Sequence, residues 1–209
     1  MKLYATSRIS RRLGEKFFFK AERDQTPKSA MVRRPYPPGV HGKRRRRPAV
    51  SEFGAELQEK QKVRFLYGLS DTALKNYATR SSRARDKTKT QALLEMLERR
   101  VDNVVFRLGL APSRRIARHL VSHGHIALNG KPVKTPSILV KPGDRVSIRE
   151  SSRQIPVFEG LEIRLKKYQT PEWLTINTAE GAGEIKRLPS ESDNLISYNL
   201  SKVIEYYSR

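Results

Sequence analysis

The chain has 209 residues, of which 43 are Lys or Arg and 21 are Asp or Glu, giving a net charge of +22. A charge of this size favours a polyanionic partner and repels further copies of the same chain. There is no cysteine, which excludes disulfides and thiolate metal sites, and no apolar run approaches the roughly 20 residues that span a bilayer, so we expect an intracellular protein without a membrane partner.

The positive charge is concentrated in two segments of the chain. The net charge is +12 over 1–50, +4 over 51–110, +7 over 111–149 and −1 over 150–209. A surface that is basic only for solubility would spread its excess charge along the chain. The uneven distribution therefore predicts two separate contact regions for nucleic acid.

Residues 1–50 are predicted to form a basic, extended N-terminal arm. Five prolines disfavour regular structure there, so we expect the arm to become ordered on its partner. A run of four arginines is also typical of a solvated leader or a nuclear-localisation signal, and this alternative stays open for the arm by itself. The candidate RNA-contacting residues in this part of the chain are Tyr36, Arg44, Arg45, Arg46, Arg47 and, in the helix that follows the arm, Lys62.

Two helices are predicted after the arm. The first begins at Ser51, has an acidic first turn and apolar residues at helical spacing, and is stopped by Gly68. Ser70 or Asp71 caps a second, shorter helix. The basic and polar stretch 79–89 is expected to be a connector.

A single helix is predicted from about Thr90 to Leu108, because seven apolar residues recur along one stripe at helical spacing. Gly109 is placed to end this helix. Asp102 and Asn103 fall inside it, where we expect them to make local hydrogen bonds rather than to act as an acid or a base.

A fourth helix is predicted between Ser113, which can cap it, and Gly124, which ends it. Its outer face is cationic, and no acidic residue occurs over 111–134. Arginine grips phosphate oxygens through its planar fork, so we expect this face to bind RNA and to tolerate replacement of its three arginines by alanine without unfolding. A merely solvated basic face is the alternative. The candidate RNA-contacting residues here and in the following hairpin are Arg114, Arg115, Arg118, His119, Ser122, His123, Lys131 and Lys134.

The remainder of the chain predicts a small sheet and a final helix. Strands are expected on either side of Asn129-Gly130, a pair typical of a type I′ hairpin. Apolar residues at helical spacing between 196 and 207 predict a last helix that packs back on the earlier helices. Further strands are expected at 138–140, 145–149 and 173–176.

The predicted fold class is α+β, with three parts. The basic arm, 1–50, precedes a discontinuous helical domain formed by 51–90 and 185–209, which the C-terminal helix completes. The inserted segment, 91–184, is expected to be an α+β RNA-binding domain.

Catalysis and metal binding are not expected. The sequence has no Gly-rich phosphate loop, no HExxH motif and no nucleophile signature, so we do not expect an enzyme. His119, His123 and His125 lie among arginines without a nearby carboxylate, a setting that repels cations, and no metal or other cofactor is expected. The wide minor groove and junctions of RNA suit such a module better than DNA, whose major groove favours a recognition helix with Asn or Gln.

Seven segments occur in the order and approximate spacing of one known family. They are RRLGEKF (11–17), YPPGVHGKRRRR (36–47), SEFGAELQEKQKVRFLYGL (51–69), LLEMLERRVDNVVFRLGLA (93–111), SHGHIALNGKPV (122–133), VKPGD (140–144) and PEWL (171–174). Together they resemble the bacterial-type small-subunit ribosomal protein S4 family over nearly the whole chain. The resemblance marks about 98–150 as the S4-type RNA-binding module, which some pseudouridine synthases also carry.

This resemblance implies a structural constituent of the small ribosomal subunit that binds a junction in the five-prime domain of small-subunit ribosomal RNA and nucleates assembly. It also implies neighbouring ribosomal proteins, including protein S5, as partners, a contact with messenger RNA where it enters the subunit, and a contribution to translational accuracy. The expected location is the ribosome, in the cytoplasm or in an organelle. An RNA-modifying or remodelling enzyme and a free translational repressor stay open as alternatives, because they could use the same module.

One feature departs from the family pattern. Many relatives hold their N-terminal arm with a cysteine-ligated zinc, whereas this sequence has no cysteine. The arm is therefore expected to be ordered by RNA or by packing. The segment 189–195 corresponds to the interface with a neighbouring protein.

Overall fold

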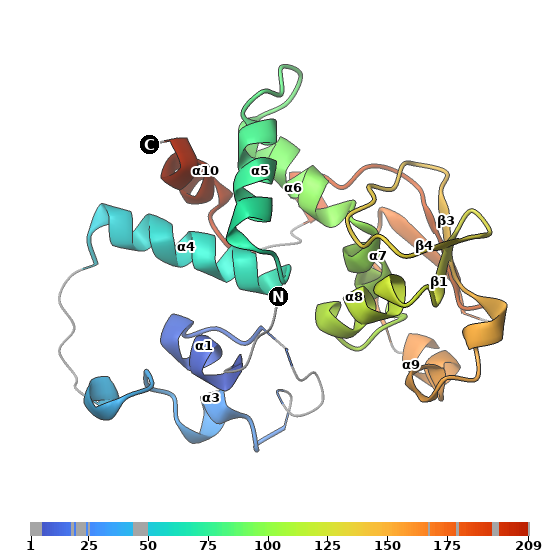
Figure 1. Cartoon of the computed structure of the whole chain (residues 1–209), viewed down its shortest axis with the longest axis horizontal. Coiled ribbons are helices and arrows are strands. Elements are labelled where there is room, and N and C mark those ends of the chain that lie inside the picture. The colour runs from blue at the N-terminus through green and yellow to red at the C-terminus, as the bar shows by residue number, and fades with distance from the viewer. Residues whose placement is uncertain are drawn as a thin grey trace. The chain divides into compact units, whose positions relative to one another are not determined.

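The computed structural model describes residues 6–17, 19, 24, 26–43, 50–166, 168–178, 180–193 and 197–208. The chain divides into two compact units (Figure 1). Met1–Thr90 and Ile196–Arg209 form the first unit, and Gln91–Leu195 forms the second.

The first unit is helical. The last helix packs on two helices from the earlier part of the chain, α4 and α5, as the sequence predicted (Figure 1). The described elements of this unit are α1 (Thr6–Leu13), α3 (Ala30–Arg33), the 3-10 helix η1 (Val40–Lys43), α4 (Glu52–Leu66), α5 (Asp71–Ser81) and α10 (Leu200–Ser208).

The predicted starts of α4 and α5 are confirmed. Ser51 and Ser70 are the N-caps, and each side-chain hydroxyl accepts the backbone N–H three residues later at 3.2 Å. Gly68, with φ of +62°, follows the end of α4. Because α5 continues to Ser81, it occupies the first part of the predicted connector 79–89.

The arm contains regular structure that its proline content did not predict. The helices α1 and α3 lie within it, and α1 packs against both α3 and α4. Phe17 and Phe19 are buried, with their ring centroids 6.2 and 6.4 Å from that of Phe65 on α4. The expectation of an arm without regular structure is therefore wrong for these residues, because tertiary packing stabilises short helices that composition alone disfavours.

A polar cluster fixes α10 to α4 and α5. The nearly buried Lys60 Nζ lies 2.7 Å from Asp71 Oδ1 and 4.5 Å from the ring centroid of Tyr206. The hydroxyl of Tyr207 donates to the same carboxylate oxygen at 3.3 Å. The hydrogen bond from Lys60 holds the pKa of Asp71 below its usual value, and burial raises the pKa of Tyr207.

The second unit combines helices with an antiparallel sheet, and the predicted α+β class is confirmed. The five strands have the order β2-β1-β3-β5-β4, and one core joins the sheet to α7, α8 and α9. The elements are α6 (Lys89–Glu98, which begins at the boundary of the unit), α7 (Val101–Arg107), α8 (Arg114–Ser122), β1 (Ile126–Leu128), β2 (Lys131–Val133), β3 (Arg145–Ile148), the 3-10 helices η2 (Glu150–Ser152) and η3 (Pro156–Phe158), α9 (Leu161–Lys166), β4 (Leu174–Asn177), β5 (Ala182–Ile185) and the 3-10 helix η4 (Glu191–Asp193).

The segment 90–108 is two helices, α6 and α7, and the prediction of one continuous helix is wrong. At the break, the main chain of Arg100 is extended and forms an isolated β-bridge with Leu139. The buried Arg100 guanidinium also pairs with Asp102 at 2.7 Å. Pairing with a distant segment thus replaces helical hydrogen bonds at this point. The predicted strand 138–140 is also wrong, since only this single bridge forms there.

The predicted hairpin is confirmed. The strands β1 and β2 pair with Ile126 opposite Val133. Asn129 and Gly130 have φ of 51° and 79°, the positive values that both central residues of a type I′ turn require. The strands β3 and β4 lie close to their predicted ranges, whereas β5 was not predicted.

Candidate nucleic-acid interface

The helix α8 is fixed by its cap and by its apolar side. The hydroxyl of Ser113 accepts the Ile116 N–H at 3.3 Å, and Gly124, with φ of +75°, follows its end. The helix packs against α7 (Figure 1). Its buried residues are Ala117, Leu120 and Val121. The outer side of α8 is therefore held in a set orientation.

Arg115 and Arg118 on α8 differ in how far their side chains are exposed to solvent. Arg115 is exposed, and within the described part of the chain it has no hydrogen-bond or ion-pair partner. Arg118 is 35% exposed, and its Nε lies 3.7 Å from Asp102 Oδ2. Arg115 is consequently the α8 arginine that is most available to a phosphate group.

Arg114 is half-buried, unlike its two neighbours. Its Nε donates to Asn103 Oδ1 at 2.8 Å, and its guanidinium carbon lies 4.4 Å from the ring centroid of Phe106. The expectation that all three arginines share an exposed face is therefore wrong for Arg114. Its replacement by alanine would remove contacts within the fold as well as charge.

A buried polar network supports this arrangement. The completely buried Glu98 carboxylate accepts hydrogen bonds from Arg107 at 2.8 and 2.9 Å and from Asn103 Nδ2 at 2.8 Å. Asn103 is thereby oriented to present its Oδ1 to Arg114. The prediction that Asp102 and Asn103 serve local hydrogen bonds is confirmed. The network ties α8 to α6 and α7.

Three histidine rings form a stack at the end of α8. The ring centroids of His119 and His123, and those of His123 and His125, are each 6.2 Å apart, with interplanar angles of 15° and 28°. Nδ1 of His125 is within 3.0 Å of Ser152 Oγ, whereas the other two rings are more open to solvent. Ser122 is exposed on the same turn. Flat rings on a basic surface can stack on unpaired RNA bases.

Lys134 extends the basic surface from α8 to the hairpin. Its Cε lies 3.4 Å from the position that a Cβ would occupy on Gly124, so its side chain covers the end of the helix. Lys131 is exposed on β2. The candidates chosen from the sequence omit three further cations nearby, of which the lack of acidic residues from 111 to 143 could have indicated only Lys141. These cations are the exposed Lys141, Arg145 and Arg149, of which Arg145 forms an ion pair with Glu180.

Two candidates in the first unit already make contacts within it. Lys62 Nζ lies 2.8 Å from Glu59 Oε1 and 3.9 Å from Glu15 Oε1, so its charge is largely balanced. The ring of Tyr36 lies 4.9 Å from the guanidinium carbon of Arg11. The remaining candidates, Arg44, Arg45, Arg46 and Arg47, lie outside the described residues.

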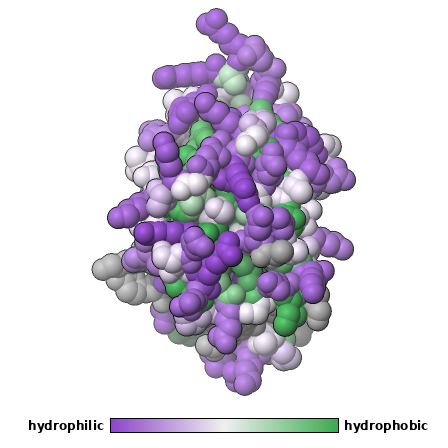
Figure 2. Space-filling view, turned by 90° about the vertical axis from the view of Figure 1, so that its right-hand side faces the viewer, coloured by the Kyte–Doolittle hydropathy of each residue, from purple (hydrophilic) through white to green (hydrophobic). Residues whose placement is uncertain are grey.

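The surface chemistry favours a polar partner. Hydrophilic side chains cover most of the face in Figure 2, and apolar side chains form only small patches on it. Within the described ranges, no helix has the length and hydropathy needed to cross a membrane. The same part of the chain holds no group of three or more His, Asp or Glu side chains arranged to bind a metal ion.

Comparison with known proteins gives matches along nearly the whole chain. Residues 2–98 match the ribosomal protein S4/S9 N-terminal domain, and residues 99–146, which include α8 and the hairpin, match the S4 domain. Relatives described as small ribosomal subunit protein uS4 include that of Thermus thermophilus, which is 44% identical over 203 residues. Those of Halothermothrix orenii and Geotalea daltonii are 42% and 43% identical. Each alignment covers 97% of this chain and 96% of the relative.

Proposed function

The chain belongs to the small ribosomal subunit protein uS4 family, and from this premise we propose that it binds a junction in the five-prime domain of small-subunit ribosomal RNA and nucleates assembly there. Membership makes the protein a structural constituent of the small subunit that binds ribosomal RNA. It also excludes the alternative of an RNA-modifying enzyme. The site of binding and the role in assembly are the proposal.

The observation that carries this proposal is the arrangement of cations and flat rings on α8 and the hairpin. Arg115, Arg118 and Lys134 place positive charge around the stacked histidines, and the network under α8 holds them in position. Phosphate contacts would supply most of the affinity, while the rings of His119 and His123 would stack on bases that a junction leaves unpaired.

We also propose two specific partners besides ribosomal RNA, namely protein S5 and messenger RNA. The segment 189–195 corresponds to the family's interface with a neighbouring protein, and its described part includes Asp193, which Arg187 holds at 2.5 Å. The arm, with its arginine run 44–47, is proposed as the second RNA contact. The relatives named above are bacterial, which favours a cytoplasmic bacterial ribosome over an organellar one.

The absence of cysteine allows a direct test of RNA proximity. A Ser122→Cys variant carries a single thiol beside His119 and His123, to which an iron-EDTA reagent can be attached. In reconstituted small subunits, hydroxyl radicals from this position should cut ribosomal RNA strongly, at sites confined to the five-prime domain.

Ser201→Cys on α10 is the matched control, because it is also an exposed serine on a helix but lies outside the proposed surface. It should give a different and weaker set of cuts. Absence of cleavage from position 122 in assembled subunits, or cleavage only outside the five-prime domain, would contradict the proposal.

A further inference from the structure

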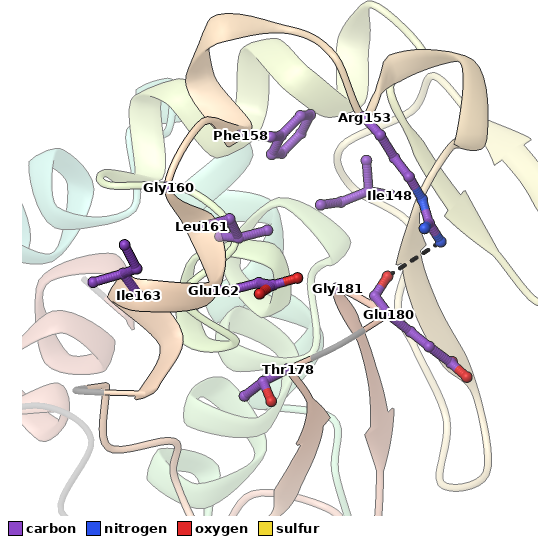
Figure 3. Close-up of a pocket in the computed structure, with 10 residues that line it drawn as sticks. All are labelled: Ile148, Arg153, Phe158, Gly160, Leu161, Glu162, Ile163, Thr178, Glu180 and Gly181. Carbon is purple, nitrogen blue, oxygen red and sulfur yellow. Dashed lines mark hydrogen bonds between the residues drawn. The ribbon is translucent and has the colours of Figure 1, made fainter.

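A pocket of about 360 Å³ lies in the second unit, and none of the candidate RNA-contacting residues lines it (Figure 3). It is bounded by the end of β3, by the segment from η2 to α9 and by the turn between β4 and β5. Its apolar lining includes the buried residues Ile148, Phe158 and Leu161. We call this cavity the α9 pocket. Its volume falls at the lower end of the roughly 300–1,000 Å³ of typical binding pockets.

The rim of the α9 pocket adds an exposed apolar side chain. Ile163 on α9 is 67% exposed and lies at one side of the pocket, opposite Arg153 in Figure 3. At Gly160, a Cβ would have no heavy atom within 4 Å, so the main chain leaves this side open. An exposed isoleucine beside an apolar cavity extends the surface that a partner could cover.

The charge at the α9 pocket is unlike that of the α8 surface. The exposed Glu162 directs its carboxylate into the middle of the pocket in Figure 3, whereas the carboxylate of Glu180, on the opposite side, points away from the pocket and pairs with Arg145. The only lining cation among the described residues, Arg153, donates to the Glu180 carbonyl at 3.4 Å. The segment 150–209 has a net charge of −1 in a chain of +22. A carboxylate at this position repels phosphate groups, so RNA is a poor occupant.

We propose that the α9 pocket docks a basic, extended segment of a neighbouring small-subunit ribosomal protein, and this inference rests on the proposed function. An apolar side chain of that segment contacts Ile148, Phe158 and Leu161. A flanking Lys or Arg pairs with Glu162. The combination of an apolar pocket with the Glu162 carboxylate matches a basic peptide with an apolar anchor, since complementary charge fixes the register of an interface.

Photo-cross-linking in assembled subunits tests this proposal. An Ile163→Cys variant, labelled with benzophenone maleimide, is reconstituted into small subunits with all other components, and sedimentation first establishes that it is incorporated. The expected product is a cross-link to one ribosomal protein, within a peptide that has an apolar residue flanked by Lys or Arg. Adding Glu162→Lys should lower the cross-link yield about tenfold, because it places like charges together. Adding Glu159→Lys, an exposed carboxylate that does not line the pocket, should leave the yield unchanged.

The outcomes separate this inference from the proposed function. Failure of the labelled chain to enter subunits would count against the function itself. If it enters and cross-links only to ribosomal RNA, or to nothing, the docking proposal is overturned while the function stands. A protein cross-link that Glu162→Lys does not weaken also overturns it. Should Glu162→Lys prevent incorporation, Thr178→Arg provides the same charge test from the turn between β4 and β5.

Discussion

Arg11 in the arm and Arg114 on α8 are both half-buried arginines, yet different kinds of acceptor hold them. Arg11 donates to the main-chain carbonyls at 34, 36 and 37, at 3.0, 3.0 and 3.3 Å, and so ties parts of the arm together. Arg114 instead donates to a side chain, Asn103, that the buried Glu98 orients. The arm thus uses cations to hold its own main chain, whereas α8 rests on buried polar groups that leave Arg115 and its neighbours exposed.

The largest effect should follow removal of the network under α8. Glu98→Ala removes the three hydrogen bonds that the buried carboxylate accepts from Arg107 and Asn103, which should lower the free energy of unfolding of the second unit by about 3 kcal/mol. Trp173 is the single tryptophan and is fully buried in this unit, so denaturant titration followed by its fluorescence measures the change. The exposed Glu159→Ala should alter it by less than about 0.5 kcal/mol. If Glu98→Ala lowered the free energy of unfolding by as little as Glu159→Ala, the buried network would not be what stabilises the second unit.

The resistance of the arm to proteolysis should depend on the hydrogen bonds of Arg11 and not only on its charge. Arg11→Ala removes three hydrogen bonds, each contributing about 1 kcal/mol, so trypsin should cut after Arg33 at least about tenfold faster. Arg12→Ala, at an exposed neighbour, is the control and should leave the rate unchanged. Equal rates in the two variants would show that Arg11 does not hold the arm.

A smaller effect should distinguish the two kinds of arginine on α8. Arg114→Ala should destabilise the second unit by about 1–2 kcal/mol, because it loses the bond to Asn103 and the contact with the Phe106 ring. Arg115→Ala should leave the Trp173 unfolding curve unchanged. Identical unfolding curves for both variants would mean that Arg114 is as dispensable to the fold as the sequence suggested.

The smallest effect concerns Asp71, whose carboxylate accepts a hydrogen bond from Lys60. The pKa of Asp71 is lowered in the folded state, so its stabilisation is present above its ordinary pKa of 3.8 and is lost as the pH falls through the folded value. The side chain is 50% exposed, so the contribution should stay below about 1 kcal/mol. Asp71→Asn should reduce the loss of helical circular dichroism on acidification below pH 4, whereas the exposed Asp86→Asn should not. An unchanged acid transition in Asp71→Asn would exclude this pair as its origin.

The correct parts of the sequence-based prediction rest on interactions between residues that are close together in the sequence. Caps at Ser51, Ser70 and Ser113 depend on hydrogen bonds within one turn, and the turn at Asn129-Gly130 depends on φ values that those two residues adopt readily. Such features can be read from short stretches of sequence.

Long-range contacts explain what the sequence did not predict. The break at Arg100 requires Leu139, which lies far along the chain. The strand β5 includes Gly183, where a Cβ would lie 2.3 Å from Leu108 Cδ2. Close packing therefore requires glycine at this position, although glycine disfavours strands and so hides β5 in the sequence. The half-burial of Arg114 likewise depends on Asn103 and on the Phe106 ring, and helical periodicity alone cannot show it.

The salt dependence of RNA binding tests the central claim most directly. The full chain and a variant with Arg115, Lys131 and Lys134 replaced by alanine are titrated with a five-prime-domain fragment of small-subunit ribosomal RNA at several salt concentrations. Each duplex phosphate contact contributes about 0.9 to the slope of log Kd against log salt concentration, so loss of three contacts should reduce the slope by about 2.7. Equal slopes for the two proteins, with equal Kd, would contradict the assignment of the α8 and hairpin surface as the RNA contact.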